Sequence, residues 1–274
     1  MESRHDVHVA AVRDGELVGS AGDPELVTFL RSSAKPFQAL PLALEEPDLP
    51  DDELAIACAS HDGTPEHLAA VEALLARAGC GEDDLECGPE RGARVNHNCS
   101  GKHAGMLLRV KRHGWPLPGY RDPGHPLQVE LRGIVADALG VPDPPSAVDG
   151  CGVPTYAAPL SSMALAFSRL GRGDLPGSER ITEVMRAHPV LIGGETAADT
   201  RLMLAADGLV AKRGAEGLLC AVLPDGTGVA AKVADGANRA AGPGLAAFLG
   251  IQELERDAVI NSRCEEVGRI AASL

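Results

Sequence analysis

The order of apolar and polar residues near the start of the chain predicts a β-hairpin. Apolar residues dominate 7–12 and recur at 16–18, on either side of Asp14-Gly15. An Asp-Gly pair tolerates the positive φ angles that tight hairpin turns require. The short apolar run 27–30 predicts a third strand, which leads directly into a polar segment that begins at Arg31.

The middle of the chain has the 3.6-residue periodicity of amphipathic helices. Residues 64–78 begin with a threonine followed by proline, which is typical of a helix start. Similar periodicity predicts helices over 125–139, 154–170 and 178–188. The apolar run 54–59 is compatible with either a buried strand or a buried helix.

Strand patterns return near the end of the chain. Residues 218–223 and 229–233 flank a second Asp-Gly pair and predict a second hairpin. Strands at both ends around a helical middle predict an α+β fold, in which one antiparallel sheet is completed by both chain ends and packed with helices. We expect a single domain over residues 1–274, with its helical part at roughly 64–200.

Composition and charge exclude several classes of protein. The chain has 25 Lys+Arg against 39 Asp+Glu, a formal net charge of −14, which disfavours nucleic acid and anionic membrane surfaces. No apolar run approaches the roughly 18 residues of a membrane helix, and the first residues lack the apolar stretch of an export signal. Seven scattered cysteines do not form the pattern of a secreted disulfide scaffold. We expect a cytoplasmic protein with free thiols or metal-ligating cysteines.

The first candidate for chemistry is the S-x-x-K arrangement of Ser32 and Lys35. Residues three apart share one face of a helical turn. A serine hydroxyl needs a nearby base, and a desolvated lysine can act as that base. The alternative is an exposed turn with a solvated lysine. Because Pro36 disfavours the helical conformation at the preceding residue, the pair has to lie at a helix entry with Pro36 in the first turn.

A second candidate is the polar turn that follows the apolar run 54–59. Ser60 can serve as a second nucleophile or a proton relay, and His61 as an acid or base. The alternative is that Ser60 and Asp62 only cap a turn.

The densest cluster of polar and glycine residues lies at 96–106. Cys99 and Lys102 are three residues apart, and Cys151 lies in a glycine-rich turn that can bring a second thiolate close. Two thiolates suit Zn²⁺. However, the chain has no C-x-x-C pair and two cysteines make an incomplete ligand set, so buried free cysteines are the alternative.

Two lysines near the C-terminal strands are candidates for polarising a hydroxyl. Lys212 lies immediately before a predicted strand and close to glycines that allow near backbone approach. Lys232, on the last predicted hairpin, is the competing candidate. For either residue the alternative is a solvent-facing lysine at a sheet edge.

Five segments, taken in order, resemble the L-asparaginase family typified by the rhizobial thermolabile enzyme. They are RSSAKPFQ, SHDGTPEH, NCSGKHAGM, DGCGVPTYAAPL and KRGAEG, and the resemblance spans roughly residues 8–250. It implies hydrolysis of L-asparagine to L-aspartate and ammonia on a fold similar to serine β-lactamases and serine-dependent glutaminases. We also expect a homodimer.

The resemblance further implies two Ser-Lys pairs. By motif match, the first pair falls on Ser32 and Lys35, and the second serine on Ser60. The second lysine is Lys212, with Lys232 as the alternative.

The resemblance also implies a zinc ion held by two cysteines and a lysine, which fall on Cys99, Lys102 and Cys151. A lysine must be neutral to bind a metal, so the cation itself has to lower the pKa of Lys102. The sequence departs from the family pattern at Arg213, where glycine is expected, and over 193–200.

Recognition of an amino acid requires a cation for its α-carboxylate and an acceptor for its α-ammonium group. We assign Arg31 to the carboxylate, and Asp149 to the ammonium group or to the surroundings of the metal. His61 is a further candidate for substrate binding.

The hypothesis is acyl transfer by a lysine-activated serine, with either serine as the nucleophile or both in one proton relay. Alternatives within the enzyme class are a glutaminase and a β-lactam-recognising serine hydrolase. An alternative of another class is a non-catalytic, metal-dependent amino-acid-binding module, in which the serines only hydrogen-bond the ligand.

Overall fold

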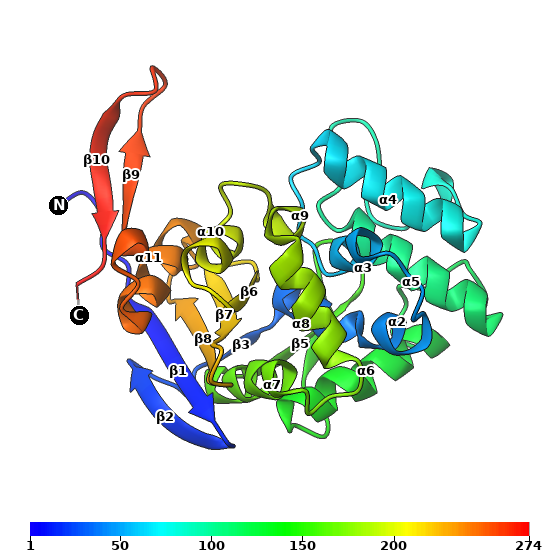
Figure 1. Ribbon diagram of the computed structural model, residues 1–274, viewed down its shortest axis with the longest axis horizontal. Coiled ribbons are helices and arrows are strands. Elements are labelled where there is room, and N and C mark those ends of the chain that lie inside the picture. Colours follow the sequence, from blue (N-terminus) through cyan, green and yellow to red (C-terminus); the bar gives the residue numbers. More distant parts are fainter. Residues whose placement is uncertain (274) are drawn as a thin grey trace.

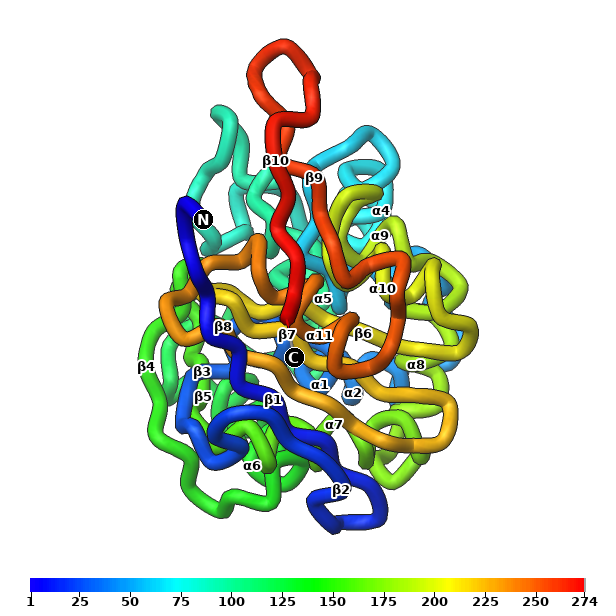
Figure 2. Tube along the Cα trace, turned by 90° about the vertical axis from the view of Figure 1, so that its left-hand side faces the viewer, coloured from blue at the N-terminus to red at the C-terminus, as the bar shows by residue number. Residues whose placement is uncertain are grey.

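The computed structural model describes residues 1–273. Its main sheet consists of β1 (Val7–Arg13), β2 (Glu16–Ala21), β6 (Val210–Arg213), β7 (Leu218–Val222) and β8 (Gly228–Val233). The strands are antiparallel and lie in the order β2-β1-β8-β7-β6. The N-terminal hairpin therefore joins the C-terminal strands at the β1–β8 pair, which Figure 2 shows side by side. The predicted α+β fold, with a sheet completed by both chain ends, is confirmed.

The segment between the two groups of strands is mainly helical and fills the right-hand side of Figure 1. Helices predicted over 64–78, 125–139 and 178–188 are all present. The elements are η1 (Arg31–Ala34), α1 (Lys35–Gln38), α2 (Leu40–Glu45), α3 (Asp51–Ala57), α4 (Pro65–Ala78), η2 (Glu82–Asp84), α5 (Ser100–His113), α6 (Pro126–Leu139), α7 (Leu160–Arg172), α8 (Ser178–Ala187), α9 (Pro189–Gly193) and α10 (Ala198–Ala205).

Helices cover both faces of the main sheet. On one face lies α11 (Asn238–Leu249), where Gly19 of β2 allows the Phe248 ring to approach. On the other face lies α7, which packs so closely on β8 that a Cβ at Gly228 would collide with the Ala164 carbonyl. The core between these layers is built mainly from alanine, leucine and valine.

Residues 154–170 do not form one helix, which corrects the prediction from periodicity. The segment begins with β5 (Pro154–Pro159), the central strand of a three-stranded sheet with β3 (Val27–Phe29) and β4 (Ser146–Val148), and only then enters α7. Nearly all of β5 is buried, so the strand lacks the polar alternation that would have distinguished it from a helix. Of the ambiguous run 54–59, residues 54–57 belong to a helix, α3, which ends before Cys58.

The chain ends in η3 (Gln252–Leu254) and a separate hairpin of β9 (Arg256–Ile260) and β10 (Glu266–Ala271). This hairpin projects from the rest of the molecule (Figure 1). The sequence analysis did not predict it. Within residues 1–273, no helix combines the length and apolar character needed to cross a bilayer.

Candidate active site

Ser60 lies in the polar turn after α3, held between two buried lysines. Its backbone N–H donates to the Ile192 carbonyl at 2.8 Å. Its Oγ lies 3.0 Å from Lys35 Nζ and 3.0 Å from Lys212 Nζ. One hydroxyl therefore contacts two amines that come from opposite ends of the chain.

Lys35 stands at the first position of α1, directly after η1, with Pro36 in the first turn as the sequence requires. Besides Ser60, its Nζ donates to the carbonyls of Ala59 and, at 3.4 Å, Asn98. The side chain is 1% exposed. Burial lowers the pKa of Lys35 because a desolvated ammonium ion is less stable.

Lys212 lies within β6, not before it, and pairs in register with Cys220. Its Nζ also donates to Asp199 Oδ2 at 3.2 Å and to the Arg213 carbonyl at 3.1 Å. Burial lowers the pKa of Lys212 to about 8, although the Asp199 carboxylate opposes that shift. Asp199 lies on α10, and sequence reasoning did not identify it because a lone aspartate carries no pattern.

Within residues 1–273 the Ser32 hydroxyl makes no hydrogen bond to the Lys35 amine, although the Lys35 backbone N–H donates to the Ser32 carbonyl. The expected first Ser-Lys pair is corrected in this respect. The buried Lys35 Nζ finds its acceptors at Ala59, Ser60 and Asn98. Ser32 instead lines the same cavity as Ser60. The Ser32 and Ser60 hydroxyls therefore share one cavity, and of the two it is the Ser60 hydroxyl that contacts the lysine amines.

Lys232, the competing candidate for the second lysine, lies at the end of β8. Its Nζ donates to the carbonyl of Val233, and its nearest charged neighbours are Glu216 and Asp235. It makes no hydrogen bond to Ser60 within residues 1–273, so Lys212 is the lysine that the structure brings to the serine.

His61 is fully engaged by the protein and has no ring nitrogen left for a substrate. Ser100 Oγ donates to the Val95 carbonyl at 2.7 Å, so it accepts from His61 Nε2–H at 2.9 Å. His61 Nδ1 accepts from Gly63 N–H at 3.2 Å. Burial lowers the pKa of His61 to about 3, so its ring is neutral at physiological pH.

A cavity of about 470 Å³ opens beside the serines, a volume typical of small-molecule sites. Asn98, Arg213 and Gly214 join Ser32 and Ser60 in its wall. Its outer part is completed by Thr196, in the turn before α10, and by residues of α10, α11 and β9, which include Arg201, Asn238, Arg239 and Asp257.

The three residues assigned to zinc lie together, each no more than 4% exposed. Cys99 directly precedes α5 and Lys102 lies in its first turn, while Cys151 follows β4. Lys102 Nζ lies 2.9 Å from Cys151 Sγ. Gly101 allows this end of α5 to approach α3, because a Cβ there would collide with the Ile56 carbonyl.

The ionisation of the two thiols depends on each other and on the lysines. A hydrogen bond from the Cys151 thiol, with nearby Lys35 and Lys102, holds the pKa of Cys99 well below its usual range. Burial would lower the pKa of Lys102, but the negative charge on the two sulfurs outweighs burial and raises it. If Lys102 is to serve as a ligand, its proton must therefore be released to solvent as the metal binds.

Arg31 and Asp149 bind each other rather than standing apart. Asp149 Oδ1 accepts from Arg31 Nε at 2.5 Å and from Gly150 N–H at 2.8 Å. Asp149 Oδ2 lies 3.9 Å from Cys151 Sγ. Burial would raise the pKa of Asp149, but the positive charges of Lys102 and Arg31 lower it. The two residues form an ion pair beside the thiols.

His103, which the sequence analysis did not single out, lies behind Cys151. Tyr120 OH accepts from Glu86 N–H at 2.8 Å, so its own proton goes to His103 Nδ1, 2.6 Å away. The His103 proton then resides on Nε2, which has no oxygen or nitrogen partner within residues 1–273 and faces Cys151. Burial lowers the pKa of His103 to about 4, which keeps the ring neutral.

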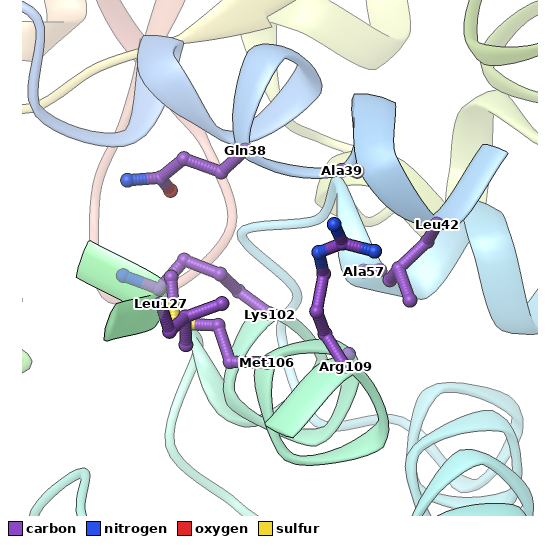
Figure 3. Close-up of a pocket in the computed structure, with 9 residues that line it drawn as sticks. Gln38, Ala39, Leu42, Ala57, Lys102, Met106, Arg109 and Leu127 are labelled. Atoms are coloured by element: carbon purple, nitrogen blue, oxygen red, sulfur yellow. The ribbon is translucent and has the colours of Figure 1, made fainter. Parts of the chain in front are cut away.

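The stem of Lys102 lines a second, much smaller cavity of about 10 Å³, about the space of a single water. In Figure 3, Lys102 and Gln38 extend in the same direction from opposite walls, and Arg109 lies at the other end. This space is too small for a substrate.

The donor set fits a soft divalent cation. Two cysteine thiolates and a neutral lysine amine are sulfur and nitrogen donors of the kind that Zn²⁺ prefers. Within residues 1–273 no three His, Cys, Asp or Glu side chains cluster closely enough to hold a metal, so a metal bound here would need Lys102 as its third ligand.

Comparisons with known proteins identify the family and the fold. Residues 1–270 match the family model of L-asparaginase II. A search of curated proteins finds no match. Among solved structures, the native form of Mglu superimposes with a TM-score of 0.52 and 16% identity, over 91% of this chain and 63% of Mglu. This chain thus spans less than two thirds of Mglu, and the likeness shows the fold alone.

A second solved structure is EstCE1, a hydrolase with promiscuous acyltransferase activity. It has a TM-score of 0.44 and 14% identity, over 90% of this chain and 92% of EstCE1. The family match, in contrast, covers nearly the whole chain. The chain belongs to the L-asparaginase II family.

Proposed function

We propose that this enzyme hydrolyses the side-chain amide of L-asparagine through a serine ester, with Ser60 as the nucleophile. The observation that carries the proposal is the position of Ser60 Oγ, 3.0 Å from both Lys35 Nζ and Lys212 Nζ. A serine hydroxyl becomes nucleophilic when an adjacent base takes its proton.

Lys35 is the base in this proposal, and Lys212 remains an ammonium ion. The Lys212 charge is balanced by the buried carboxylate of Asp199, 3.2 Å away. Within residues 1–273, Lys35 has no carboxylate partner, and its hydrogen-bond acceptors besides Ser60 are the Ala59 and Asn98 carbonyls. The anionic sulfur beside it, Cys99, is assigned to zinc, so a bound ion would share that charge. Of two neighbouring buried lysines, the one without a carboxylate counter-ion more readily loses its proton.

The reaction then follows from the geometry. Ser60 Oγ attacks the amide carbon while Lys35 accepts the hydroxyl proton. Lys35 returns this proton to the nitrogen, the C–N bond breaks and ammonia leaves an aspartyl ester on Ser60. Water attacks the ester with Lys35 again as base, which releases aspartate and restores the serine. Lys212 donates to Ser60 Oγ and stabilises its negative charge.

We also propose that Cys99, Lys102 and Cys151 hold Zn²⁺. When bound, the ion supplies a fixed positive charge that polarises or orients a ligand beside the serine cavity. Asp149 and the His103 ring fix the orientation of Cys151, and Arg31 in turn holds Asp149. The Lys35 amine is close to both Ser60 and Cys99, so the serine–lysine cluster and the cysteine cluster are adjacent.

The test is an ammonia-release assay on purified protein, accompanied by metal analysis. We expect L-asparagine to be hydrolysed faster than L-glutamine and a chromogenic β-lactam to remain intact. Faster glutamine or β-lactam hydrolysis would support the corresponding alternative enzyme. Asparagine binding by calorimetry without ammonia release would support the non-catalytic binding module and overturn the ester mechanism.

We further propose that the enzyme is a cytoplasmic homodimer. All seven cysteines are free, which suits a reducing compartment. Sedimentation velocity and cell fractionation test the two statements separately.

A further inference from the structure

The cavity beside the serines has a positive wall. Three arginines line it, Arg201, Arg213 and Arg239, against the single acidic residue Asp257. The chain as a whole has a formal charge of −14. A local excess of arginine in an acidic protein favours a ligand with a negatively charged group.

Two of these arginines are poorly placed to bind a ligand beside Ser60, because Arg201 is in an ion pair and Arg239 lies at the exposed rim of the cavity. Arg201 Nη1 is 2.6 Å from Asp257 Oδ1, so the ion pair neutralises its charge. Arg239 is exposed and donates to Ser3 Oγ at 2.8 Å and to His5 Nε2 at 3.2 Å. Neither lies against the serine.

Arg213 follows Lys212 at the end of β6 and contacts the backbone of the nucleophile itself. Its Nη2 donates to the Ser60 carbonyl at 2.7 Å and to the Gly193 carbonyl at 3.2 Å. The same nitrogen lies 3.4 Å from Asp62 Oδ1. These contacts fix the guanidinium group through one of its three nitrogens.

The other two nitrogens of Arg213 retain their donors. Nε and Nη1 make no hydrogen bond to any residue of 1–273, and Nη1 is 3.7 Å from Asp199 Oδ1. The side chain is 28% exposed where it borders the cavity. A fixed guanidinium with unused N–H groups is the arrangement that binds a carboxylate.

Arg31 is less suited to that role than the sequence suggested. Its Nε is bound to Asp149 at 2.5 Å, and Asp149 Oδ1 already accepts a second bond from Gly150. Arg31 is also not among the residues that line the cavity beside the serines, whereas Arg213 is.

We propose that Arg213 binds the α-carboxylate of the amino-acid substrate and so selects amides that carry a carboxylate. This proposal rests on the proposed hydrolysis and adds a specificity-determining residue to it. Because the Arg213 guanidinium is anchored to the Ser60 carbonyl, it fixes the distance between the bound carboxylate and the nucleophile.

The test compares Arg213→Gln with wild type on three amides. Asparagine has both α-groups, succinamate keeps the carboxylate but lacks the amine, and β-alaninamide keeps the amine but lacks the carboxylate. We expect Arg213→Gln to raise KM for asparagine and succinamate about ten- to a hundredfold, the effect of losing a charge-assisted hydrogen bond. For β-alaninamide, kcat/KM should change less than about twofold, and Arg213→Lys should restore part of the loss.

Two controls separate carboxylate binding from a structural role. Arg201→Gln removes a cavity arginine that is already neutralised, so it should raise KM less than Arg213→Gln does. If Arg213 only positions the Ser60 backbone, Arg213→Gln will lower kcat equally for all three amides, and that result overturns the proposal. Circular dichroism and thermal unfolding confirm that both variants are folded.

A binding measurement distinguishes failure of this proposal from failure of the hydrolytic one. Calorimetry with L-aspartate, the reaction product, requires no turnover. Weaker aspartate binding by Arg213→Gln supports the carboxylate subsite even if wild type hydrolyses no amide. Equal binding by the two proteins, or no binding by wild type, overturns it.

Discussion

The two buried lysine clusters differ in the atoms that surround each amine. Lys212 meets the Ser60 hydroxyl and the Asp199 carboxylate, and its pKa is lowered to about 8. Lys102 meets the sulfur of Cys151, and its pKa is raised. The cluster of Ser60, Asp199 and Lys212 can therefore exchange protons near neutral pH. The sulfur cluster, which consists of Cys99, Lys102 and Cys151, is suited to a soft cation. The same side chain thus has two roles, set by its partners.

The largest effect should come from Ser60→Ala, which removes the hydroxyl between the two lysines. We expect kcat/KM for asparagine to fall at least about a thousandfold, as expected for loss of a nucleophile. Zinc content should not change, because the sulfur cluster is intact. Ser262→Ala, in the turn of the projecting hairpin, is the control. Near-normal activity of Ser60→Ala would remove the basis of the serine mechanism.

Asp199→Asn should be the next most damaging change. It leaves the Lys212 ammonium without its buried counter-ion, so the pKa of Lys212 should fall further. We expect kcat/KM to drop about a hundredfold and the free energy of unfolding in urea to drop by about 3–5 kcal/mol. An unchanged zinc dissociation constant would show that the clusters are separable. Unaltered kcat/KM would show that the Lys212 charge is dispensable.

In the sulfur cluster, His103→Ala should raise the zinc dissociation constant about ten- to a hundredfold, the usual cost of losing a group that orients a metal ligand. Tyr120→Phe, which removes the proton donor to His103 Nδ1, should have a smaller effect of the same sign. Competition with a chromogenic chelator measures both. Zinc affinity equal to wild type in His103→Ala would mean that the ring does not support Cys151.

Removal of zinc should affect binding more than chemistry. We expect a chelator to raise KM for asparagine about tenfold while kcat changes less than about threefold, because the ion lies beside the serine cluster and not within it. Cys151→Ser should reproduce that pattern. Loss of kcat at saturating asparagine would instead give the metal a chemical role.

The smallest effect is on the pH profile. The pKa of Lys212 is about 8, and the mechanism needs its ammonium form. As pH rises through about 8 the ammonium loses its proton, so kcat/KM should fall to half of its plateau near that pH. Asp199→Asn should move this limb to lower pH. A kcat/KM that still rises between pH 8 and 10 would indicate that Lys212 acts as the base.

Much of the fold could be predicted because its signals are local. The hairpin turn at Asp14-Gly15, the helix start at Thr64 and the position of Pro36 in the first turn of α1 depend on neighbouring residues only. The strand β5 was missed because it is buried on both faces and therefore lacks alternation.

The sequence indicated most residues of the site, but it did not indicate which of them contact one another. Lys35 is three residues from Ser32 in sequence, yet its long side chain crosses the interior to Ser60. Asp199 and Arg213 act through contacts that only the fold creates. Spacing along the chain therefore identified the candidates, and tertiary structure decided their partners.

The most direct measurement of the central claim is to locate the acyl group during turnover. An activated β-ester of L-aspartate should acylate the enzyme faster than water removes the acyl group, so the covalent intermediate accumulates and survives an acid quench. Peptide mapping by mass spectrometry should then find the aspartyl group on Ser60. An aspartyl group on Ser32, or on any other residue, would contradict the account.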